Sequence, residues 1–351
     1  MQINQDKLNA LLGQMVGDMG AAAAAPLVVI GDRVGLYRAL AGEGPLTSAQ
    51  LAEKTGTNER YVREWCSAQA GYGYITYDRA TGAFSMTPEQ AAVFADPDSP
   101  ASMIGGYYAI VSMAIDEHKI ADIFRSGRGF GWGEHHACLF CGTEKFFRPG
   151  YMSNLVQEWL PALEGVVPKL EKGAKVADVG CGHGASTIVM AHAFPNSQFI
   201  GYDFHAPSVD NANQRARDAG VKNVQFKTAT AKDYPAEGYD LIAFFDCLHD
   251  MGDPVGAAAH ARKAIKPDGT LMLVEPFAGD DLADNLNPVG RMYYAFSTMI
   301  CTPASLSQEV GLALGAQAGP KRLMGVLNEG GFSKTRVATS TPFNLIIEGR
   351  V

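Results

Sequence analysis

The segment Val176–Thr187 combines residue types that bind a charged cofactor: an apolar strand runs into a cluster of glycines, and a helix follows. Glycines allow the backbone to approach a ligand closely, and a helix N-terminus offers unpaired N–H groups and the positive end of a dipole. Both features suit the pyrophosphate of a dinucleotide or the carboxylate of a methionine moiety. Gly180, Gly182 and Ala185 also satisfy the looser dinucleotide fingerprint, so their spacing leaves both cofactors open.

Two acidic residues at strand ends bear on this choice. Asp178 precedes Gly180 by two residues, where its carboxylate could meet the ammonium group of S-adenosylmethionine. A nicotinamide-binding loop needs no acid there, so Asp178 favours S-adenosylmethionine; the alternative is an aspartate that only braces the loop. Asp203 ends the next strand and can accept both ribose hydroxyls of either cofactor, unless it caps a helix.

The other predicted cofactor contacts also follow the carboxyl ends of strands, where ligands bind in open sheets of this kind. An ordinary loop is the alternative for the residues after the third strand. The predicted contacts are Phe204, Thr230, Ala231, Phe245 and Asp246.

His249 is the candidate general base. Its imidazole titrates near neutral pH, and it follows the fourth predicted strand at the edge of the cofactor crevice. Glu275 ends the fifth strand next to it and would orient His249 or raise its pKa. The alternative is a histidine that only packs or caps.

A second cluster of polar residues, Glu134–Cys138 with Cys141, has residue types that bind zinc, and two residues between cysteines is a permitted spacing. The sequence offers no second pair at ligand spacing. We therefore predict no metal, and favour substrate-pocket or structural roles. The candidate pocket residues are His135, His136, Phe147, Tyr293 and Tyr294.

The chemistry-bearing motifs lie in a region where strands and helices alternate, which is typical of a parallel doubly wound sheet. The last two strands are joined by only a few residues and must be antiparallel. An insertion, 280–319, interrupts the alternation. The predicted strands are Val176–Val179, Gln198–Tyr202, Val224–Lys227, Leu241–Phe245, Thr270–Val274, Lys334–Ala338 and Phe343–Glu348.

The N-terminal region has the pattern of a winged helix: two short helices, capped before Ser48 and at Asn58, precede strands predicted at Gly73–Tyr77 and Ala83–Met86. Its second helix could read DNA, but acidic and basic residues balance along it, so dimerisation is the favoured role. We expect three parts: a winged-helix and dimerisation domain at 1–98, a helical connector and pocket lid at 99–170, and a cofactor-binding domain at 171–351.

The composition narrows the class of protein. The 351 residues are 47% hydrophobic and 19% charged, which suits a large packed core. The net charge of −8 makes nucleic acid an improbable partner. The N-terminus lacks the pattern of a signal peptide, and the apolar stretch Ala21–Ile30 is short and contains Pro26, so we predict no membrane segment. Six scattered cysteines indicate reduced thiols and a cytoplasmic location.

These motifs together resemble small-molecule O-methyltransferases that join a winged helix to a class I Rossmann-like domain, and most closely a bacterial group without assigned substrates. Asp178–Gly184 matches the family's glycine loop, and Leu248–Asp253 resembles its Leu-His-Asp-Trp-x-Asp segment. The resemblance implies that His249 is the base and Glu275 its partner. Met251 replaces the usual tryptophan, Thr230 stands where an acid is common, and the 280–319 insertion is additional.

We therefore expect a homodimeric enzyme that transfers the methyl group of S-adenosylmethionine to a small-molecule hydroxyl and releases S-adenosylhomocysteine. Three alternatives stay open. They are an N- or C-methyltransferase acting by proximity alone, a nicotinamide-dependent oxidoreductase, and a regulator that senses S-adenosylmethionine and binds DNA.

Overall fold

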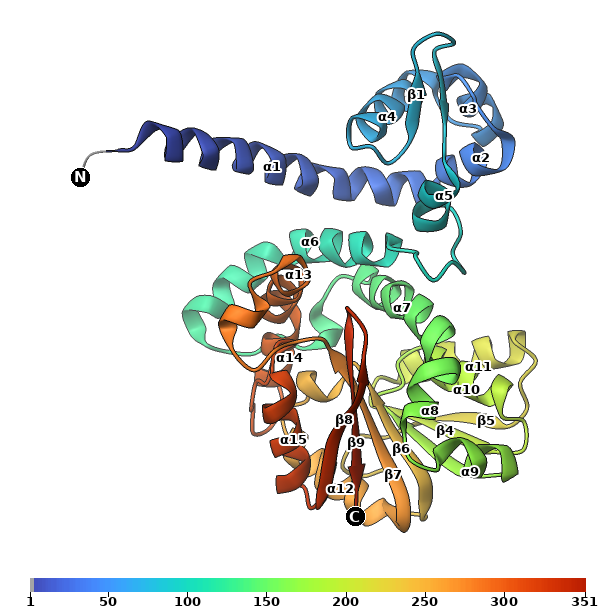
Figure 1. Ribbon diagram of the computed structural model, residues 1–351, viewed down its shortest axis with the longest axis vertical. Helices are drawn as coiled ribbons and strands as arrows, with labels where there is room; N and C mark the ends of the chain where they lie inside the picture. Colours follow the sequence, from blue (N-terminus) through green and yellow to red (C-terminus); the bar gives the residue numbers. More distant parts are fainter. Residues whose placement is uncertain (1–2) are drawn as a thin grey trace. The chain divides into compact units, whose positions relative to one another are not determined.

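The computed structural model describes residues 3–351 and divides the chain into two compact units (Figure 1). The first unit extends up to Ala114 and includes Ala137–Pro149; the second comprises Ile115–His136 and Gly150–Val351. The helices α6 (Ile104–Ser126) and α7 (Cys138–Gly150) each contribute residues to both units.

The first unit contains the predicted winged helix. Thr47 and Gln50 form a capping box, and Asn58 caps the following helix through a bond from Arg60 N. Its core gathers around Tyr37 and Trp65, whose rings lie 4.9 Å apart. Its elements are α1 (Gln5–Arg33), α2 (Leu36–Glu43), α3 (Ser48–Thr55), α4 (Glu59–Gly71), β1 (Thr76–Asp78), β2 (Ala83–Ser85) and α5 (Pro88–Phe94).

The first strand of the wing is shorter than predicted. Gly73 has a φ of 75°, and Tyr74 N donates to Gln69 O at 2.9 Å. This hydrogen bond and the left-handed glycine end α4 in a turn. The turn occupies residues that the alternating sequence pattern had assigned to the strand. The antiparallel pairing therefore begins only at Thr76, opposite Ser85.

Helix α1 continues through Pro26, which the sequence reading took as an interruption. Among the described residues, α1 is the one helix that is both long enough and apolar enough to cross a membrane. Of its most apolar 18-residue stretch, 22% is buried. A single helix of this kind near an N-terminus is weak evidence for a span, because core helices and signal sequences share the same length and composition.

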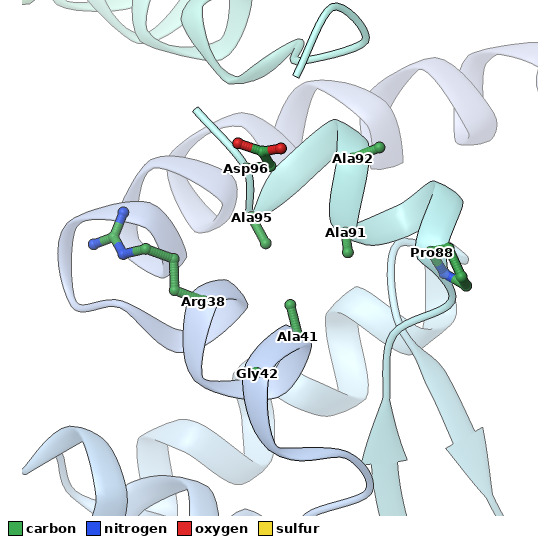
Figure 2. A pocket seen from close by; sticks show the side chains of 8 residues that line it. All are labelled: Arg38, Ala41, Gly42, Pro88, Ala91, Ala92, Ala95 and Asp96. Atoms are coloured by element: carbon green, nitrogen blue, oxygen red, sulfur yellow. The ribbon is translucent and has the colours of Figure 1, made fainter. Parts of the chain in front are cut away.

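A cavity of about 420 Å³ lies between α2 and α5 in the first unit (Figure 2). Small apolar side chains such as Ala41 and Ala91 line it, and Arg38 and Asp96 are the charged residues of its lining. It holds no nucleophile and no histidine, so it does not resemble an active site.

The second unit is built on a seven-stranded sheet in the order β5-β4-β3-β6-β7-β9-β8. The first five strands of this order pair in parallel, and β9 is antiparallel to both of its neighbours, as predicted for the final strands. The strands are β3 (Lys175–Val179), β4 (Gln198–Asp203), β5 (Val224–Thr228), β6 (Tyr239–Phe245), β7 (Ile265–Pro276), β8 (Lys334–Ser340) and β9 (Asn344–Arg350).

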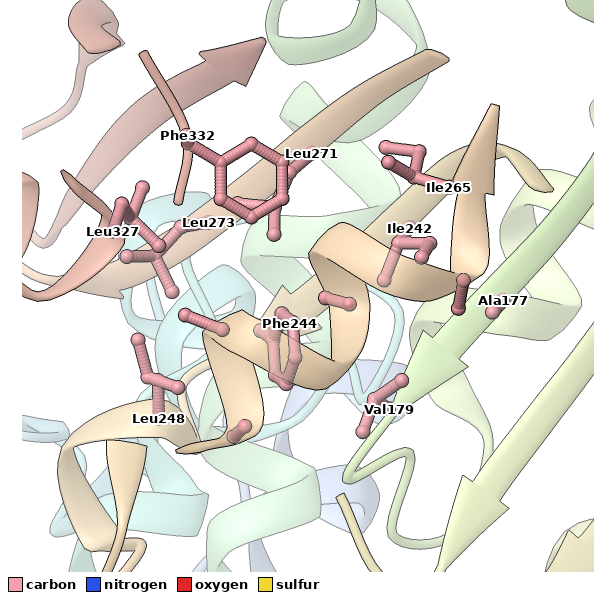
Figure 3. Close-up of a cluster of buried hydrophobic side chains, with 14 of the residues drawn as sticks. Ala177, Val179, Ile242, Phe244, Leu248, Ile265, Leu271, Leu273, Leu327 and Phe332 are labelled. Atoms are coloured by element: carbon pink, nitrogen blue, oxygen red, sulfur yellow. The ribbon is translucent and has the colours of Figure 1, made fainter. Parts of the chain in front are cut away.

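The core of this unit lies against the centre of the sheet (Figure 3). Phe244 and Leu273 from the strands pack with Leu327 from α15 and with alanines of α12, and all are essentially inaccessible to solvent. Truncating a fully buried phenylalanine such as Phe244 to alanine costs about 3–5 kcal/mol. The helices are α8 (Leu160–Ala162), α9 (Val166–Lys172), α10 (Ala185–Ala193), α11 (Ala206–Asp218), α12 (Pro254–Ala264) and α15 (Gly319–Glu329).

The insertion after β7 is helical and forms hydrogen bonds with the segment that follows His249. Ser305 Oγ donates to Met251 O at 2.8 Å, and Gln308 Nε2 donates to Asp250 O at 2.9 Å. Its elements are η4 (Leu282–Asn285), α13 (Pro288–Phe296), the π-helical segment η5 (Ser297–Cys301) and α14 (Thr302–Leu306). Three further short segments of the unit are η1 (Trp132–Glu134), the π-helical η2 (Tyr151–Trp159) and η3 (Leu248–Asp250).

Candidate functional site

The glycine loop lies between β3 and α10, at the carboxyl end of the central strand. Gly180 and Gly182 have φ values of 77° and 51°, which other L residues rarely adopt. A side chain on Gly180 would meet Cys247 Sγ at 2.7 Å, whereas one on Gly182 would point into open space. The backbone at Gly182 is therefore exposed on the side where a ligand would lie.

Asp178 is fully buried beneath this loop. Its Oδ2 accepts hydrogen bonds from Ser186 Oγ at 2.7 Å and Thr187 Oγ1 at 2.6 Å. Its Oδ1 is also buried, and none of residues 3–351 donates a hydrogen bond to it. Burial raises the pKa of Asp178 to about 6, even though the two hydroxyls lower it. The unpaired oxygen marks a place where a cationic group would restore a lost interaction.

Asp203 ends β4 beside the loop. Its Oδ2 accepts from Gly182 N at 2.9 Å and its Oδ1 from His205 N at 2.8 Å. Burial raises the pKa of Asp203, although these two hydrogen bonds lower it. Each carboxylate oxygen keeps a second lone pair, so the side chain can still accept from a diol.

The other predicted cofactor residues follow the neighbouring strands of the same sheet. Phe204 is 59% exposed after β4, and Thr230 is exposed after β5. Ala231 is partly buried, while the Phe245 ring lies 5.4 Å from Tyr151 at the end of β6. Parallel pairing brings these strand ends to one edge of the sheet.

Asp246, the last predicted cofactor residue, has a φ of 50°. Tyr151 OH donates to its Oδ2 and Asn344 Nδ2 to its Oδ1, both at 2.8 Å. Burial and the nearby Glu275 carboxylate raise the pKa of Asp246 well above its ordinary value. No pattern in the sequence pointed to Tyr151 or Asn344, which lie 95 and 98 residues away from Asp246.

The structure brings His249 and Glu275 together as predicted. Both are buried, and the His249 Nδ1 atom is paired with Glu275 Oε2. Glu275 Oε1 accepts from Leu248 N at 2.9 Å, which holds the carboxylate in place. This pairing orients the ring so that Nε2 is the nitrogen left for chemistry.

Three residues that the sequence analysis did not single out surround His249 Nε2. Asp250 Oδ1 lies 3.2 Å from Nε2, and Trp132 Nε1 donates to Asp250 Oδ2 at 3.1 Å. Cys301 Sγ lies within 4.8 Å of a ring nitrogen of His249 and of a carboxylate oxygen of Asp250. Burial disfavours the imidazolium, but Glu275 and Asp250 outweigh it and raise the pKa of His249 well above its usual value. Asp250 could have been noticed as the sequence neighbour of His249, whereas Cys301 is reached only through the insertion.

His135 belongs to the same unit and is fully buried at its side chain. Its Nδ1 lies 3.2 Å from Asp116 Oδ2, and its Nε2 receives no partner from the described residues. Burial lowers the pKa of His135, so the ring is neutral near pH 7. His136 is exposed, and its backbone N donates to Asp116 Oδ2 at 2.9 Å.

The remaining pocket candidates are two tyrosines and a phenylalanine. Tyr293 is buried and donates to Phe343 O at 2.9 Å, and Tyr294 is partly buried. Phe147 belongs to the first unit. Among residues 3–351, the group of histidine, cysteine and acidic side chains at metal-ligand spacing does not include residues 134–141. In that segment, Arg33 Nη2 donates to Cys138 Sγ at 3.2 Å, and Cys141 is exposed.

Two family descriptions match separate parts of the chain. Residues 170–331 match "Methyltransferase domain", and residues 22–95 match "Rv2258c-like winged HTH domain". The predicted order of a winged helix followed by a class I methyltransferase fold is thereby confirmed.

Curated relatives match over part of the chain. A ubiquinone biosynthesis O-methyltransferase of Leptothrix cholodnii is 30% identical over 133 residues, covering 37% of this chain and 54% of the relative. The uncharacterized methyltransferase YcgJ of Bacillus subtilis is 28% identical over 122 residues, covering 34% and 47%. The chain thus spans about half the length of the curated relatives it matches.

Solved structures match over the whole chain. Human N-acetylserotonin methyltransferase in complex with SAM has a TM-score of 0.68 at 17% identity, with 100% of this chain and 99% of that chain covered. An O-methyltransferase family protein of Burkholderia thailandensis has a TM-score of 0.66 at 18% identity, with the same coverage. At these identities the similarity establishes the fold.

Proposed function

We propose that this chain, which joins an N-terminal winged helix-turn-helix domain to a methyltransferase domain, transfers the methyl group of S-adenosylmethionine to a hydroxyl of a small molecule. Domains of this class use S-adenosylmethionine, so the cofactor prediction is confirmed at the level of the domain. The observation that carries the proposal for this chain is the buried, unpaired Oδ1 of Asp178 beside the glycine loop.

The residues at the loop fit the cofactor. Asp178 Oδ1 would accept from its ammonium group, and the open backbone face at Gly182 would admit the methionine end. Asp203 would accept from the ribose hydroxyls, and the residues after β5 and β6 would flank the adenine. When bound, S-adenosylmethionine supplies a methyl group that its positive sulfur already makes electrophilic.

His249 would then act as the general base. In the neutral form of the ring, Nε2 takes the proton from the acceptor hydroxyl, while Glu275 holds Nδ1 and compensates the charge that forms on the ring. Because the methyl group is already activated, the remaining task of the chain is to align the acceptor with it and to exclude water. His135, paired with Asp116, is the pocket candidate in the same unit that keeps an unpaired nitrogen.

The relatives support a small-molecule acceptor, because they include ubiquinone biosynthesis O-methyltransferases and a 27-O-demethylrifamycin SV methyltransferase. We extend the proposal to a homodimer formed through the first unit. The N-terminal half of α1 exposes Leu11, Leu12, Val16 and Met19 by 54–65%, an apolar stripe that a second copy would cover. The thiol state of the six cysteines supports a cytoplasmic location.

DNA binding by the winged helix has less support. On α4, Arg63 pairs with Glu59 at 2.7 Å, and Arg60 pairs with Glu64 at 2.5 Å. These pairs neutralise the helix that would enter a groove.

The cofactor is tested first by binding. S-adenosylhomocysteine should raise the melting temperature of the wild-type protein, whereas NAD should not, and Asp178→Ala should weaken binding by at least about tenfold because a charge-assisted hydrogen bond is lost. Stabilisation by NAD but not by S-adenosylhomocysteine would overturn the proposal.

The base is tested by turnover. An acceptor is first identified by transfer of labelled methyl groups to a library of hydroxylated small molecules. With that acceptor, His249→Ala should lower kcat by about 10²–10⁴-fold and leave S-adenosylhomocysteine affinity intact. Unchanged turnover would exclude His249 as the base and favour transfer by proximity alone.

A further inference from the structure

His249, Asp250 and Cys301 place three different ligand atoms around one point. Their ligand atoms all lie within 4.8 Å of one another, and all three residues are buried. In the described chain, this is the group of three histidine, cysteine or acidic side chains that meets this spacing. The set combines a nitrogen, an oxygen and a sulfur, and it comes from two segments, η3 and η5, that are distant in sequence.

The distance between two of these atoms fits a tetrahedral ion. Zinc binds histidine nitrogen and carboxylate oxygen at about 2.0–2.2 Å, so such ligands lie roughly 3.3–3.5 Å apart on the edge of a tetrahedron. His249 Nε2 and Asp250 Oδ1 are 3.2 Å apart. Cys301 Sγ lies within 4.8 Å of the other two ligand atoms, a range that admits the bond of about 2.3 Å between zinc and a thiolate.

The atoms behind these ligands are also arranged as at metal sites. A ligating histidine usually gives its other nitrogen to a carboxylate, which fixes the ring and makes the ligand more basic. Glu275 is paired with His249 Nδ1 in this way, and Trp132 Nε1 donates to the far oxygen of Asp250. The near oxygen, Asp250 Oδ1, receives no hydrogen bond from residues 3–351, although Asp250 is only 7% exposed.

Cys301 owes its position to an irregular helix. It is the last residue of the π-helical segment η5, which continues directly into α14. A π-helical turn rotates the following side chains relative to an α-helix, and such turns are frequent at functional sites. Here the turn accompanies the placement of a thiol next to His249 and Asp250.

We propose that His249 Nε2, Asp250 Oδ1 and Cys301 Sγ form a Zn²⁺ site that switches off methyl transfer. Thiolate and imidazole ligands select zinc over magnesium or calcium. On binding, the Cys301 thiol and a protonated His249 ring each release a proton to solvent, and the sulfur, Nε2 and the Asp250 oxygen each donate a lone pair, leaving a fourth position for water.

The inhibitory role rests on the proposed function. The lone pair of His249 Nε2 cannot both bind the ion and accept a proton from the acceptor. Zinc and base catalysis are therefore mutually exclusive at this atom. The site is distinct from the glycine loop, so zinc leaves the binding of S-adenosylhomocysteine in place.

Metal binding is tested directly on the full-length protein after treatment with a chelator. Zn²⁺ is titrated against a chromophoric chelator, and Co²⁺ serves as the spectroscopic probe. We expect one ion per chain and a thiolate-to-cobalt charge-transfer band in the near ultraviolet. Cys301→Ser should abolish the band, and both Cys301→Ser and Asp250→Asn should weaken zinc binding by on the order of 100-fold.

The matched control is the double variant Cys138→Ser/Cys141→Ser, which removes the two cysteines at zinc-ligand spacing in the sequence and should bind zinc like the wild type. Retained stabilisation by S-adenosylhomocysteine shows that each variant is folded. A band that persists in Cys301→Ser, or zinc binding that disappears only in the double variant, overturns the site.

Activity separates the two proposals. Stoichiometric zinc should reduce wild-type turnover by at least tenfold and spare Cys301→Ser. If the enzyme retains full turnover when zinc occupies the His249–Asp250–Cys301 site, the inhibitory role is overturned. If no acceptor is ever methylated, the proposed function fails while the metal-binding result stands by itself.

Discussion

Tyr151 donates a hydrogen bond to Asp246 at 2.8 Å and thereby ties the π-helical segment η2 to the end of β6. Asp246 has a φ of 50°, a left-handed conformation that costs free energy for a residue with a side chain. Asn344 holds the other carboxylate oxygen. Two hydrogen bonds thus secure a strained backbone next to the cofactor loop and His249.

Tyr151→Phe should lower the free energy of unfolding by about 1–3 kcal/mol, because a buried carboxylate oxygen loses its donor. Chemical denaturation measures the change. Tyr77→Phe is the control, since Tyr77 is 51% exposed in the wing and should be neutral. Equal stability of the two variants would show that the Tyr151 bond does not secure the strand end.

Asp178 should make the stability of the empty protein depend on pH. Its pKa of about 6 lies above the ordinary value of 3.8, so burial favours the neutral form. The resulting stabilisation is fully present below pH 3.8 and is lost as the pH rises through 6. Asp178→Asn removes this titration, so its stability relative to the wild type should increase by up to about 3 kcal/mol between pH 4 and pH 8.

Denaturation at several pH values tests this dependence. The exposed Asp210→Asn on α11 is the control and should give a constant difference from the wild type. Asp178→Asn should also bind S-adenosylhomocysteine more weakly, so the same change stabilises the empty fold and impairs the site. A pH-independent difference for Asp178→Asn would mean that its carboxylate is not desolvated.

Glu275→Gln should separate orientation from charge at His249. Glutamine can still accept from Leu248 N, but it brings no negative charge to Nδ1. We expect kcat to fall by about 10–100-fold, less than for loss of the base itself, with the acceptor KM little changed. The test compares the kcat and KM values of Glu275→Gln with those of Glu158→Gln, a control at an exposed position. An equal loss of kcat in the two variants would show that Glu275 does not support His249.

Charges on the exposed stripe of α1 should dissociate the proposed dimer. Leu12→Asp together with Val16→Asp would place charges where we expect two copies to meet. Sedimentation should then report a monomer. Leu286→Asp, on a leucine of the insertion that is more exposed than either residue, should leave the assembly unchanged. A wild-type protein that sediments as a monomer at micromolar concentration would refute the dimer directly.

Local patterns in the sequence were enough to predict the sheet, its antiparallel end and the winged helix. Alternation of strands and helices specifies a parallel sheet, and a link of a few residues forces antiparallel pairing. The same order implies that Asp178, Asp203 and His249 meet at one edge, because parallel strands end on the same side. The wing was predicted less well, since a helix-terminating turn at Gly73 competes locally with the strand pattern.

Only the tertiary structure decided what surrounds these residues. Cys301 and Asn344 approach the strand ends from segments 52 and 98 residues away from His249 and Asp246, and their own sequence context carries no sign of it. Hydrogen-bond satisfaction is likewise a three-dimensional property, so the sequence could not show that Asp178 Oδ1 receives no hydrogen bond from residues 3–351. The sequence determined that Asp178 precedes a cofactor loop, whereas packing of the described residues decided which of its oxygens found a donor.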